Sequence, residues 1–392
     1  MKLAWVSAPP WANTGYGKVT REFLKRIKYP DEIISVTTGG FNAGPFIEWN
    51  GIKVFPGRQV ETGKGDITLV SLQQVLANEK CTHWIFHADA WAYKELIKQV
   101  GLSFPAITYS PIDGGHVSPE EFEALRAAQQ RIAMCHYAER EIKATGLSAE
   151  YIPHGVDTKV FKPLNKDECR EKMGLPKDTF IVGFFGTNIS KRKGQAEMMM
   201  AFKHALDKGK QFKVILCTDQ DGRGVGGYNL WNLADYIGVP RKLLMFPKNV
   251  YDFTEEELAI MYNSFDVLIN LSRGEGFGIP ILESEACGTP VIATDYTSMT
   301  ELVDGHGFLA PVLAYDVYTL KTQFHAIPDY NAAGEALIKC IDNPDLVKSM
   351  GKRASRFAQK YDWDKLGPLW NRALKKVDEM PFFPPYMVKE FK

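Results

Sequence analysis

Short apolar runs of strand length alternate with amphipathic stretches of helix length along most of the chain. This alternation limits the possible folds more than any other feature of the sequence. In the first part of the chain the predicted strands are Leu3–Val6, Glu32–Val36, Ile67–Val70, Trp84–Phe86 and Ala106–Tyr109. Strands that alternate with helices are typical of parallel sheets covered by helices on both faces. We therefore predict an α/β unit at the beginning of the chain.

A second series of strand-like runs begins after a passage rich in proline and charge, residues 163–178. Its predicted strands are Phe180–Phe185, Phe212–Cys217, Leu243–Phe246, Val267–Asn270 and Val291–Ala293. A chain of 392 residues is too long for one ordinary core, so two domains are expected. We predict one α/β domain over residues 1–165 and another over 166–365. Residues 366–392 are predicted to form a helix and a tail of prolines and aromatics that returns to the first domain.

Composition excludes several functional classes. The chain has 47 basic and 47 acidic side chains, which argues against non-specific binding of nucleic acid. Its six cysteines show no C-x-x-C spacing, which favours buried thiols in a reducing compartment over disulfides or a zinc site. There is no signal-peptide pattern and no apolar run of transmembrane length. A cytoplasmic protein is expected, and contact with a membrane surface stays open.

The passage over residues 266–293, DVLINLSRGEGFGIPILESEACGTPVIA, predicts a buried strand, a glycine-rich turn, a short helix and another strand. Pro280 suits the first turn of that helix, and Gly288 suits the position after its end. A helix N-terminus offers free N–H groups and a positive dipole end, which bind phosphate or sugar oxygens. Glu275 and Glu283 stand before and within the first turns, where carboxylates can accept hydrogen bonds from ligand hydroxyls.

The two glutamates, seven residues apart in E-G-F-G-x-P-x-L-E and followed by A-C-G-T-P-V-I-A, resemble the signature of the retaining family 4 glycosyltransferases (glycosyl transferases group 1). Further passages in the same order resemble other landmarks of that family: residues 152–163, 186–194, 258–266, 301–305 and 361–365. The resemblance implies the GT-B fold, in which two Rossmann-like domains face each other across a cleft. The first domain would lie on the acceptor side and the second would bind a nucleotide sugar.

The resemblance also assigns roles to individual residues. With Arg192 added on the grounds given below, the predicted donor-binding set is Gly15, Gly17, Gly186, Arg192, Lys193, Val250, Tyr251, Glu275, Gly276, Phe277, Gly278 and Glu283. Within this set Glu275 and the loop after it hold the sugar, Glu283 holds the ribose, and Lys193 binds the diphosphate. The chain has Thr187 where the family commonly has an arginine, and we expect Arg192 to supply the missing guanidinium. The catalytic candidates are Glu275, Lys193, Arg192, His87 and Asp113.

The expected reaction moves a sugar from a nucleoside diphosphate to an acceptor hydroxyl with retention of configuration. It needs neither a metal nor a cofactor, because basic side chains and helix N–H groups stabilise the leaving diphosphate. The donor can be a UDP, GDP or ADP sugar. The acceptor stays open among a glycan, a lipid-linked precursor, a small metabolite, a protein and a modified nucleobase.

Other patterns support rival interpretations. Residues 222–227 satisfy G-x-G-x-x-G, the pattern of NAD(P)-dependent oxidoreductases, but the loop begins four residues beyond its strand and lies in the second domain. Asp219 and Asp221 form a D-x-D pair of the kind that binds a metal in another fold class of glycosyltransferases, but a single pair in a polar loop is a weak signal. A catalytically inactive sugar-nucleotide-binding protein is disfavoured, because both glutamates and Lys193 are present.

Overall fold

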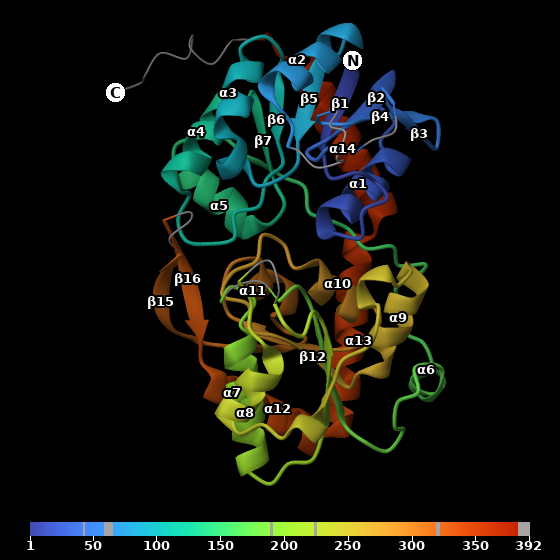
Figure 1. Ribbon diagram of the computed structural model, residues 1–392, viewed down its shortest axis with the longest axis vertical. Helices are drawn as coiled ribbons and strands as arrows, with labels where there is room; N and C mark the ends of the chain where they lie inside the picture. The colour runs from blue at the N-terminus through green and yellow to red at the C-terminus, as the bar shows by residue number, and fades with distance from the viewer. Residues whose placement is uncertain (42–43, 59–65, 189–190, 223–225, 319–321, 383–392) are drawn as a thin grey trace.

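The computed structural model describes residues 1–41, 44–58, 66–188, 191–222, 226–318 and 322–382. Two α/β units stand one above the other (Figure 1). The first unit contains a sheet with the strand order β3-β4-β2-β1-β5-β6-β7-β8. Only the β3–β4 pair is antiparallel among the pairs of this sheet in the described residues. In chain order its strands are β1 (Lys2–Ser7), β2 (Glu32–Thr37), β3 (Ile47–Trp49), β4 (Ile52–Phe55), β5 (His83–Phe86), β6 (Ala106–Thr108), β7 (Gln130–Ala133) and β8 (Glu150–Tyr151).

The second unit contains a parallel sheet with the strand order β11-β10-β9-β12-β13-β14. Its strands are β9 (Ile181–Phe185), β10 (Lys213–Cys217), β11 (Leu244–Met245), β12 (Val267–Asn270), β13 (Val291–Thr294) and β14 (Phe308–Ala310). A separate antiparallel hairpin, β15 (Val312–Tyr318) and β16 (Gln323–Pro328), extends from this unit. The prediction of two Rossmann-like units is confirmed.

Helices cover both faces of each sheet. The helices of the first unit are α1 (Gly15–Arg26), α2 (Leu69–Asn78), α3 (Lys94–Gly101), α4 (Pro119–Ala127) and α5 (His136–Ala144). Those that follow are α6 (Lys166–Lys172), α7 (Gln195–Asp207), α8 (Leu230–Ile237), α9 (Glu255–Ser264), α10 (Ile279–Ala286), α11 (Ser298–Val303), α12 (Tyr330–Asp342), α13 (Pro344–Ala358) and α14 (Trp363–Asp378). Short 3-10 turns lie at Ala90–Tyr93, Arg241–Leu243, Val250–Asp252 and Gln359–Tyr361.

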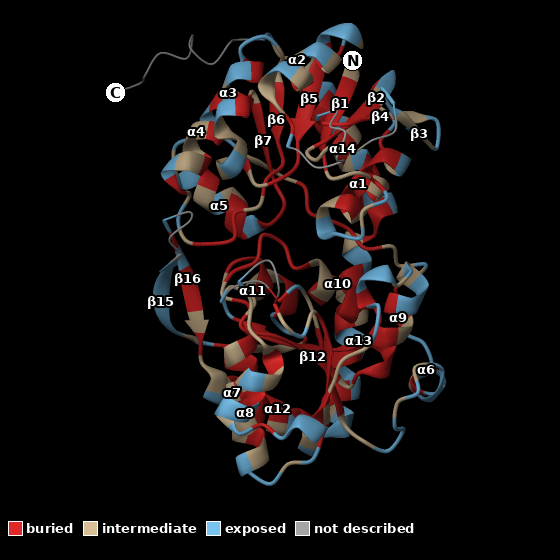
Figure 2. Ribbon diagram, viewed as in Figure 1, coloured by how far each residue is buried: buried red, intermediate tan, exposed pale blue. Residues whose placement is uncertain are grey.

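The two cores of the first unit follow from the alternation of side chains along β1. Leu3 and Trp5 belong to the core that faces α1 and α14, whereas Ala4 and Val6 belong to the core on the other face. All four side chains are fully buried. Figure 2 shows the same pattern for both units, with buried strands between partly exposed helices.

One predicted strand is wrong. Residues 67–70 read as a strand because Ile, Leu and Val dominate the run, but α2 begins at Leu69. The Thr68 side chain accepts a hydrogen bond from the Ser71 N–H, and the Ser71 hydroxyl in turn bonds the Thr68 N–H. This reciprocal cap satisfies two backbone donors that a helix start otherwise leaves without partners, so a helix forms despite the β-branched residues.

The chain crosses between the units twice, and the two crossings lie side by side. Val156 N–H donates to Tyr361 O at 2.9 Å, and Trp363 N–H donates to Val156 O at 3.3 Å. The Trp363 ring lies so close to Gly155 that a Cβ there would come within 2.6 Å of it. After the second crossing α14 packs on the first unit, as predicted for the C-terminal helix. Of the predicted tail, residues 383–392 lie outside the described residues.

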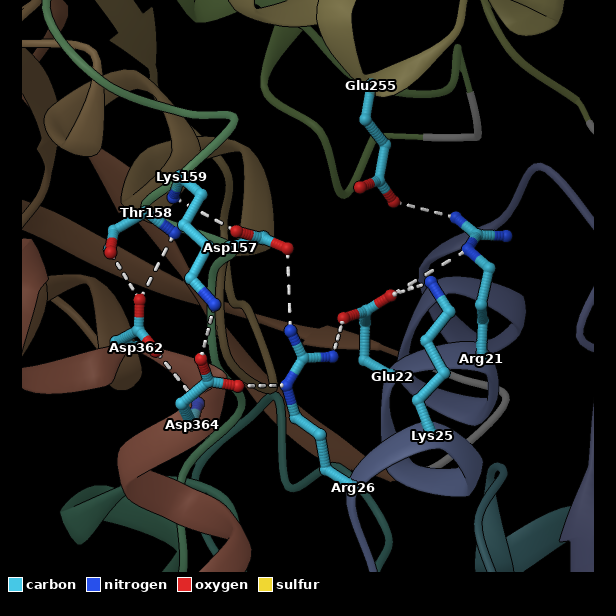
Figure 3. A network of polar contacts seen from close by, with 10 residues as sticks. All are labelled: Arg21, Glu22, Lys25, Arg26, Asp157, Thr158, Lys159, Glu255, Asp362 and Asp364. Atoms are coloured by element: carbon cyan, nitrogen blue, oxygen red, sulfur yellow. Dashed lines mark hydrogen bonds and ion pairs between the residues drawn. The ribbon is translucent and has the colours of Figure 1, made fainter.

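A network of charged side chains ties α1 to both crossings (Figure 3). The Arg26 guanidinium lies 2.7 Å from Asp364 at the start of α14 and 3.4 Å from Asp157 on the first crossing. It also contacts Glu22 one turn earlier on α1. Asp362 accepts hydrogen bonds from Thr158, so the two crossing segments are joined to each other as well as to α1.

None of the helices in the described residues has both the length and the apolar character needed to cross a membrane.

Candidate functional site

The site forms where the carboxyl ends of both parallel sheets face each other. The strand order reverses direction beside β1 in the first sheet and beside β9 in the second. In α/β sheets, ligands bind at the carboxyl ends of the strands where the order reverses. The loop after β12 then leads into α10, whose N-cap is Gly278. This residue has a φ of 98°. Glycine adopts such positive φ values readily because it has no Cβ, whereas other residues would be strained there. Pro280 lies in the first turn of α10, as predicted.

Glu275 lies at the centre of the site and is held by three side chains of its own unit. The Lys193 ammonium is 2.5 Å from one carboxylate oxygen, which also accepts from the Ser272 hydroxyl at 2.7 Å. Arg192 Nη1 lies 3.4 Å from the other oxygen. Burial alone would raise the pKa of Glu275, but the two cations lower it below its usual range. The carboxylate is therefore ionised and fixed in place.

Arg192 lies between carboxylates of both units. Its Nη1 donates to Gly274 O at 3.0 Å and lies 3.7 Å from Asp113, which follows β6 in the first unit. Burial alone would lower the pKa of Arg192, but Glu275, Asp113 and Asp89 together raise it. Burial lowers the pKa of Lys193, although Glu275 opposes that shift. The sequence-predicted residues Glu275, Lys193, Arg192 and Asp113 are therefore brought together.

His87 lies at the end of β5 and is fully buried. Its Nδ1 is 3.0 Å from the Ser7 hydroxyl, and its ring packs on those of Tyr109 and Tyr16. Among the described residues its Nε2 has no hydrogen-bond partner. Burial holds the pKa of His87 well below its usual range, so the ring is neutral at physiological pH. A neutral ring with one free nitrogen suits a hydrogen bond to a substrate hydroxyl.

Glu283 faces the first unit from the second turn of α10. One of its oxygens accepts from the Tyr262 hydroxyl at 3.0 Å, and the other contacts the Lys18 ammonium of α1. Beside this pair, Arg21 of α1 lies 2.8 Å from Glu255 of α9. Two ion pairs thus cross the cleft next to each other, which draws α1 toward α9 and α10.

A cavity of about 130 Å³ lies at these ion pairs. Gly15, Val250, Tyr251 and Glu283 all line it, so four members of the predicted donor-binding set meet in one place. Tyr251 is partly exposed and its hydroxyl lies 3.1 Å from the Asp219 backbone nitrogen.

Other predicted residues pack closely against their neighbours. A Cβ at Gly17 would come within 2.3 Å of Ala12 O, so this glycine is needed for the turn before α1. A Cβ at Gly276 would come within 2.3 Å of Pro111 of the first unit, so this glycine permits close contact between the units. Phe277 is buried against the His154 ring, and Gly186 lies against the Phe184 ring.

The rival patterns have structural explanations. Gly222 and Gly227 are described, and a Cβ at Gly227 would come within 2.1 Å of Asn188 O, so this glycine allows loop packing. Residues 223–225 of that pattern lie outside the described residues. Asp221 accepts a hydrogen bond from Asn229 at 2.9 Å. In the described part of the chain no group of three or more His, Cys, Asp or Glu side chains is placed to hold a metal ion.

Sequence reasoning missed several residues of the site. Tyr16 and Asp89 lie near Arg192, and Asp89 contributes to raising the pKa of both Tyr16 and Arg192. Burial, Asp89 and Asp113 raise the pKa of Tyr16 well above its usual value, so its hydroxyl is protonated. Asp89 stands two residues after His87, and Tyr16 stands between the two predicted glycines. Their closeness in sequence to predicted site residues is the one feature of the sequence that could have indicated them.

Comparison with known proteins agrees with this geometry. Residues 165–357 match the model of the family described as glycosyl transferases group 1. This region, just under half of the chain, is similar to the glycosyl transferases group 1 family. The similar curated proteins include D-inositol 3-phosphate glycosyltransferases of Corynebacterium jeikeium, 29% identical over 226 residues, and of Catenulispora acidiphila, 32% identical over 216 residues. These matches cover 56% and 54% of this chain, and the chain spans about half the length of these relatives, 50% and 47%.

Solved structures share the fold over nearly the whole chain. Sucrose-phosphate synthase from Thermosynechococcus elongatus has a TM-score of 0.77 at 18% identity, covering 96% of this chain and 99% of that one. HepE of Anabaena, in complex with UDP-glucose, has a TM-score of 0.70 at 17% identity, covering 96% and 100%. These likenesses show the fold, and the predicted fold class is confirmed.

Proposed function

We propose that the protein is a retaining glycosyltransferase that moves a sugar from a nucleoside diphosphate to an acceptor hydroxyl without a metal ion. The observation that carries this proposal is the arrangement at Glu275. A buried, ionised carboxylate stands directly before the N-terminus of α10 and is held by Lys193 and Arg192. The same helix presents Glu283 toward the first unit. The loop before α10 thus offers a carboxylate for the sugar and α10 itself offers one for the ribose, with Lys193 and Arg192 beside Glu275 as cations for the diphosphate.

The donor is proposed to lie along this line of residues. Its nucleobase and ribose would occupy the cavity at Val250, Tyr251 and Glu283, where the carboxylate accepts from ribose hydroxyls. The diphosphate would then reach Lys193 and Arg192, and the sugar would reach Glu275. The binding of UDP-glucose by HepE, a protein of the same fold, supports a nucleotide sugar as the class of donor.

The proposed chemistry is a front-face substitution. The acceptor oxygen bonds to the anomeric carbon on the face from which the diphosphate oxygen leaves, and the acceptor proton passes to that leaving oxygen. Negative charge on the diphosphate rises as the bond breaks, so Lys193, Arg192 and the α10 N–H groups bind the transition state more strongly than the ground state. His87 and Asp113, on the opposite side of the cleft, are proposed to orient the acceptor hydroxyl.

Two further features fit the proposal. All six cysteines are free and buried, which supports a reducing compartment such as the cytoplasm. Gly227 packs on Asn188 and the next helix, α8, begins only at Leu230, so Gly227 does not open a helix as the last glycine of an oxidoreductase fingerprint would. The acceptor is proposed to belong to one of the classes named above: a glycan, a lipid-linked precursor, a small metabolite, a protein or a modified nucleobase. The surface next to Glu275, on the side away from the nucleotide, would select among them.

Hydrolysis of UDP, GDP and ADP sugars without acceptor, followed by chromatography of the released nucleoside diphosphate, tests the proposal. One nucleotide class is expected to be cleaved slowly, and Glu275→Gln is expected to abolish the cleavage, which excludes a contaminant. A donor that binds in calorimetry but is never cleaved would favour the inactive binding protein. Binding of NADH or NADPH, with no binding of any nucleotide sugar, would overturn the proposal in favour of the oxidoreductase.

A further inference from the structure

A second and larger cavity, of about 860 Å³, lies in the cleft on the side of the β15–β16 hairpin. Helix α5 and the loop after β6 line it from the first unit, and the loop before α11 and the hairpin line it from the second. In Figure 1 the hairpin lies at the left of the cleft, whereas α1 and α9, which line the nucleotide cavity, lie at the right. The two cavities therefore occupy different ends of the same cleft.

The larger cavity adjoins the catalytic centre through two short connections. Thr297, which lines it, accepts a hydrogen bond from the Glu275 N–H at 3.0 Å. Gly115, which also lines it, follows two residues after Asp113, and Asp113 contacts Arg192. A molecule in this cavity would therefore lie next to the sugar that we place at Glu275, on the side away from the nucleotide.

The hairpin is fixed to the opposite unit at this point. Gly115 N–H donates to Phe324 O at 2.9 Å, and Phe324 N–H donates to Gly115 O at 2.7 Å. A Cβ at Gly115 would come within 2.6 Å of the Tyr296 hydroxyl, so only glycine leaves room for this contact. The hairpin thus forms a wall of the cavity that is held by backbone hydrogen bonds across the cleft.

Aromatic rings form the floor and wall of the cavity. The Tyr296 ring lies 5.8 Å from that of Tyr137 and 5.5 Å from that of Tyr315, and the Tyr315 ring lies 6.3 Å from that of Phe324. Tyr315 and Phe324 are 57% and 45% exposed and lie next to each other, so they form a contiguous exposed aromatic surface of the kind found in ligand-binding grooves. Figure 2 shows β15, which carries Tyr315, as an exposed strand.

Polar side chains surround these rings. Arg140 and His116 supply hydrogen-bond donors, and Asp295 and Asp304 supply acceptors. A saccharide matches this combination, because its ring has an apolar C–H face that packs on aromatic rings and hydroxyls at its edge that both donate and accept. An anionic membrane surface would instead require a cluster of Lys and Arg, which this mixed-charge lining does not have among the described residues.

We propose that this cavity is the acceptor subsite of the enzyme and that it binds a saccharide unit of a glycan acceptor, stacked on Tyr315 and Phe324. The inference rests on the proposed transferase function, because it places the accepting hydroxyl beside the donor sugar at Glu275. It selects a glycan from the acceptor classes that the sequence left open. The hairpin, whose role in the site the sequence did not indicate, then determines acceptor specificity.

Saturation-transfer NMR on the full chain, with methyl glycosides of glucose, galactose and mannose and with their disaccharides as probes, tests the subsite. At least one probe is expected to bind the wild-type protein. Tyr315→Ala and Phe324→Ala should weaken that binding about three- to tenfold each, the value of one aromatic contact. Leu313→Ala is the matched control, because Leu313 is an exposed apolar residue of the same strand, β15, but does not line the cavity.

The outcomes separate the two proposals. Binding of UDP or GDP by the same variants shows that the donor side is folded. If no probe binds the wild-type protein, or if both aromatic variants bind as well as Leu313→Ala, the subsite is overturned. If the variants lose binding to phosphatidylserine vesicles or to a protein partner instead, the surface serves that ligand and the glycan assignment is wrong. Saccharide binding without binding of any nucleotide sugar would leave the cavity as a saccharide site but refute the transferase.

Discussion

Arg192 provides the sharpest test of how the site works, because its role was inferred from the absence of an arginine at Thr187. In the structure its Nη1 lies 3.0 Å from Gly274 O and 3.4 Å from Glu275, so the guanidinium is fixed before any donor binds. A preorganised donor that meets a developing negative charge contributes about 2.7–4 kcal/mol to the transition state. Arg192→Ala should therefore lower kcat by about a hundredfold or more, with a smaller effect on KM.

The substitution series separates charge from geometry. Arg192→Lys keeps the charge but loses the planar fork that can bind two diphosphate oxygens, so it should restore only part of the rate. Lys193→Ala should be impaired as strongly as Arg192→Ala, because both cations also keep Glu275 ionised. Arg241→Ala serves as the matched control, because this arginine pairs with Asp235 on the surface of the same unit.

The assay is steady-state hydrolysis of saturating donor without acceptor, extended to transfer once an acceptor is found. Near wild-type kcat in Arg192→Ala, together with a crippled Lys193→Ala, would refute the proposed role of the guanidinium. Arg192 would then be a structural ion-pair partner of Asp113 and Glu275. Lys18, which contacts Glu283 across the cleft, would become the next candidate for the second cation.

Three further predictions concern the donor, the metal and the fold. Glu283→Ala should weaken UDP or GDP binding by roughly 1.5–3 kcal/mol in calorimetry, whereas Glu256→Ala, at an exposed position of α9, should not. Equal affinities of the Glu283→Ala variant and the wild-type protein would refute the ribose assignment. Donor cleavage should persist in excess EDTA, and loss with rescue by manganese or magnesium would contradict the metal-independent mechanism. Burial raises the pKa of Glu285 to about 7 despite the nearby His306. The folded state then keeps a proton that the unfolded state loses, so stability falls as pH rises from about 4.5 through 7. Glu285→Gln should remove this part of the pH dependence of Tm, and an unchanged dependence would contradict the raised pKa.

Much of the fold could be predicted because its central strands are nearly uniform apolar runs. Strands β9 and β12 are buried on both faces, and such strands are readable from composition alone. Strand β7 was missed because it contains Arg131, which is buried and donates hydrogen bonds to the Ser148 and Ala128 carbonyls. The hairpin was missed because the partners that fix it, such as Gly115, lie in the other unit.

The candidate site could be predicted from the sequence only where its residues lie close together along the chain within one unit. Glu275 and its helix lie within one continuous passage, so strand, turn and helix signals pointed to the same place. The contact of Lys18 with Glu283 joins residues 265 positions apart, and no local pattern predicts how two units will meet. The roles of these residues in donor binding and catalysis stay predictions until the variants above are measured.

The return of α14 to the first unit has a consequence for how the protein is made. The Trp370 ring packs against Trp5, Phe23 and Tyr109, so the aromatic core of the first unit contains a side chain from near the end of the chain. Ribosomes add about 5–20 residues per second, so the roughly 200 residues between α5 and α14 take about 10–40 s to synthesise. During that time the face of α1 that receives Trp370 lacks its cover. The unit that is made first is therefore completed last, and a chain stopped before Trp363 would leave that aromatic face open to chaperones and proteases.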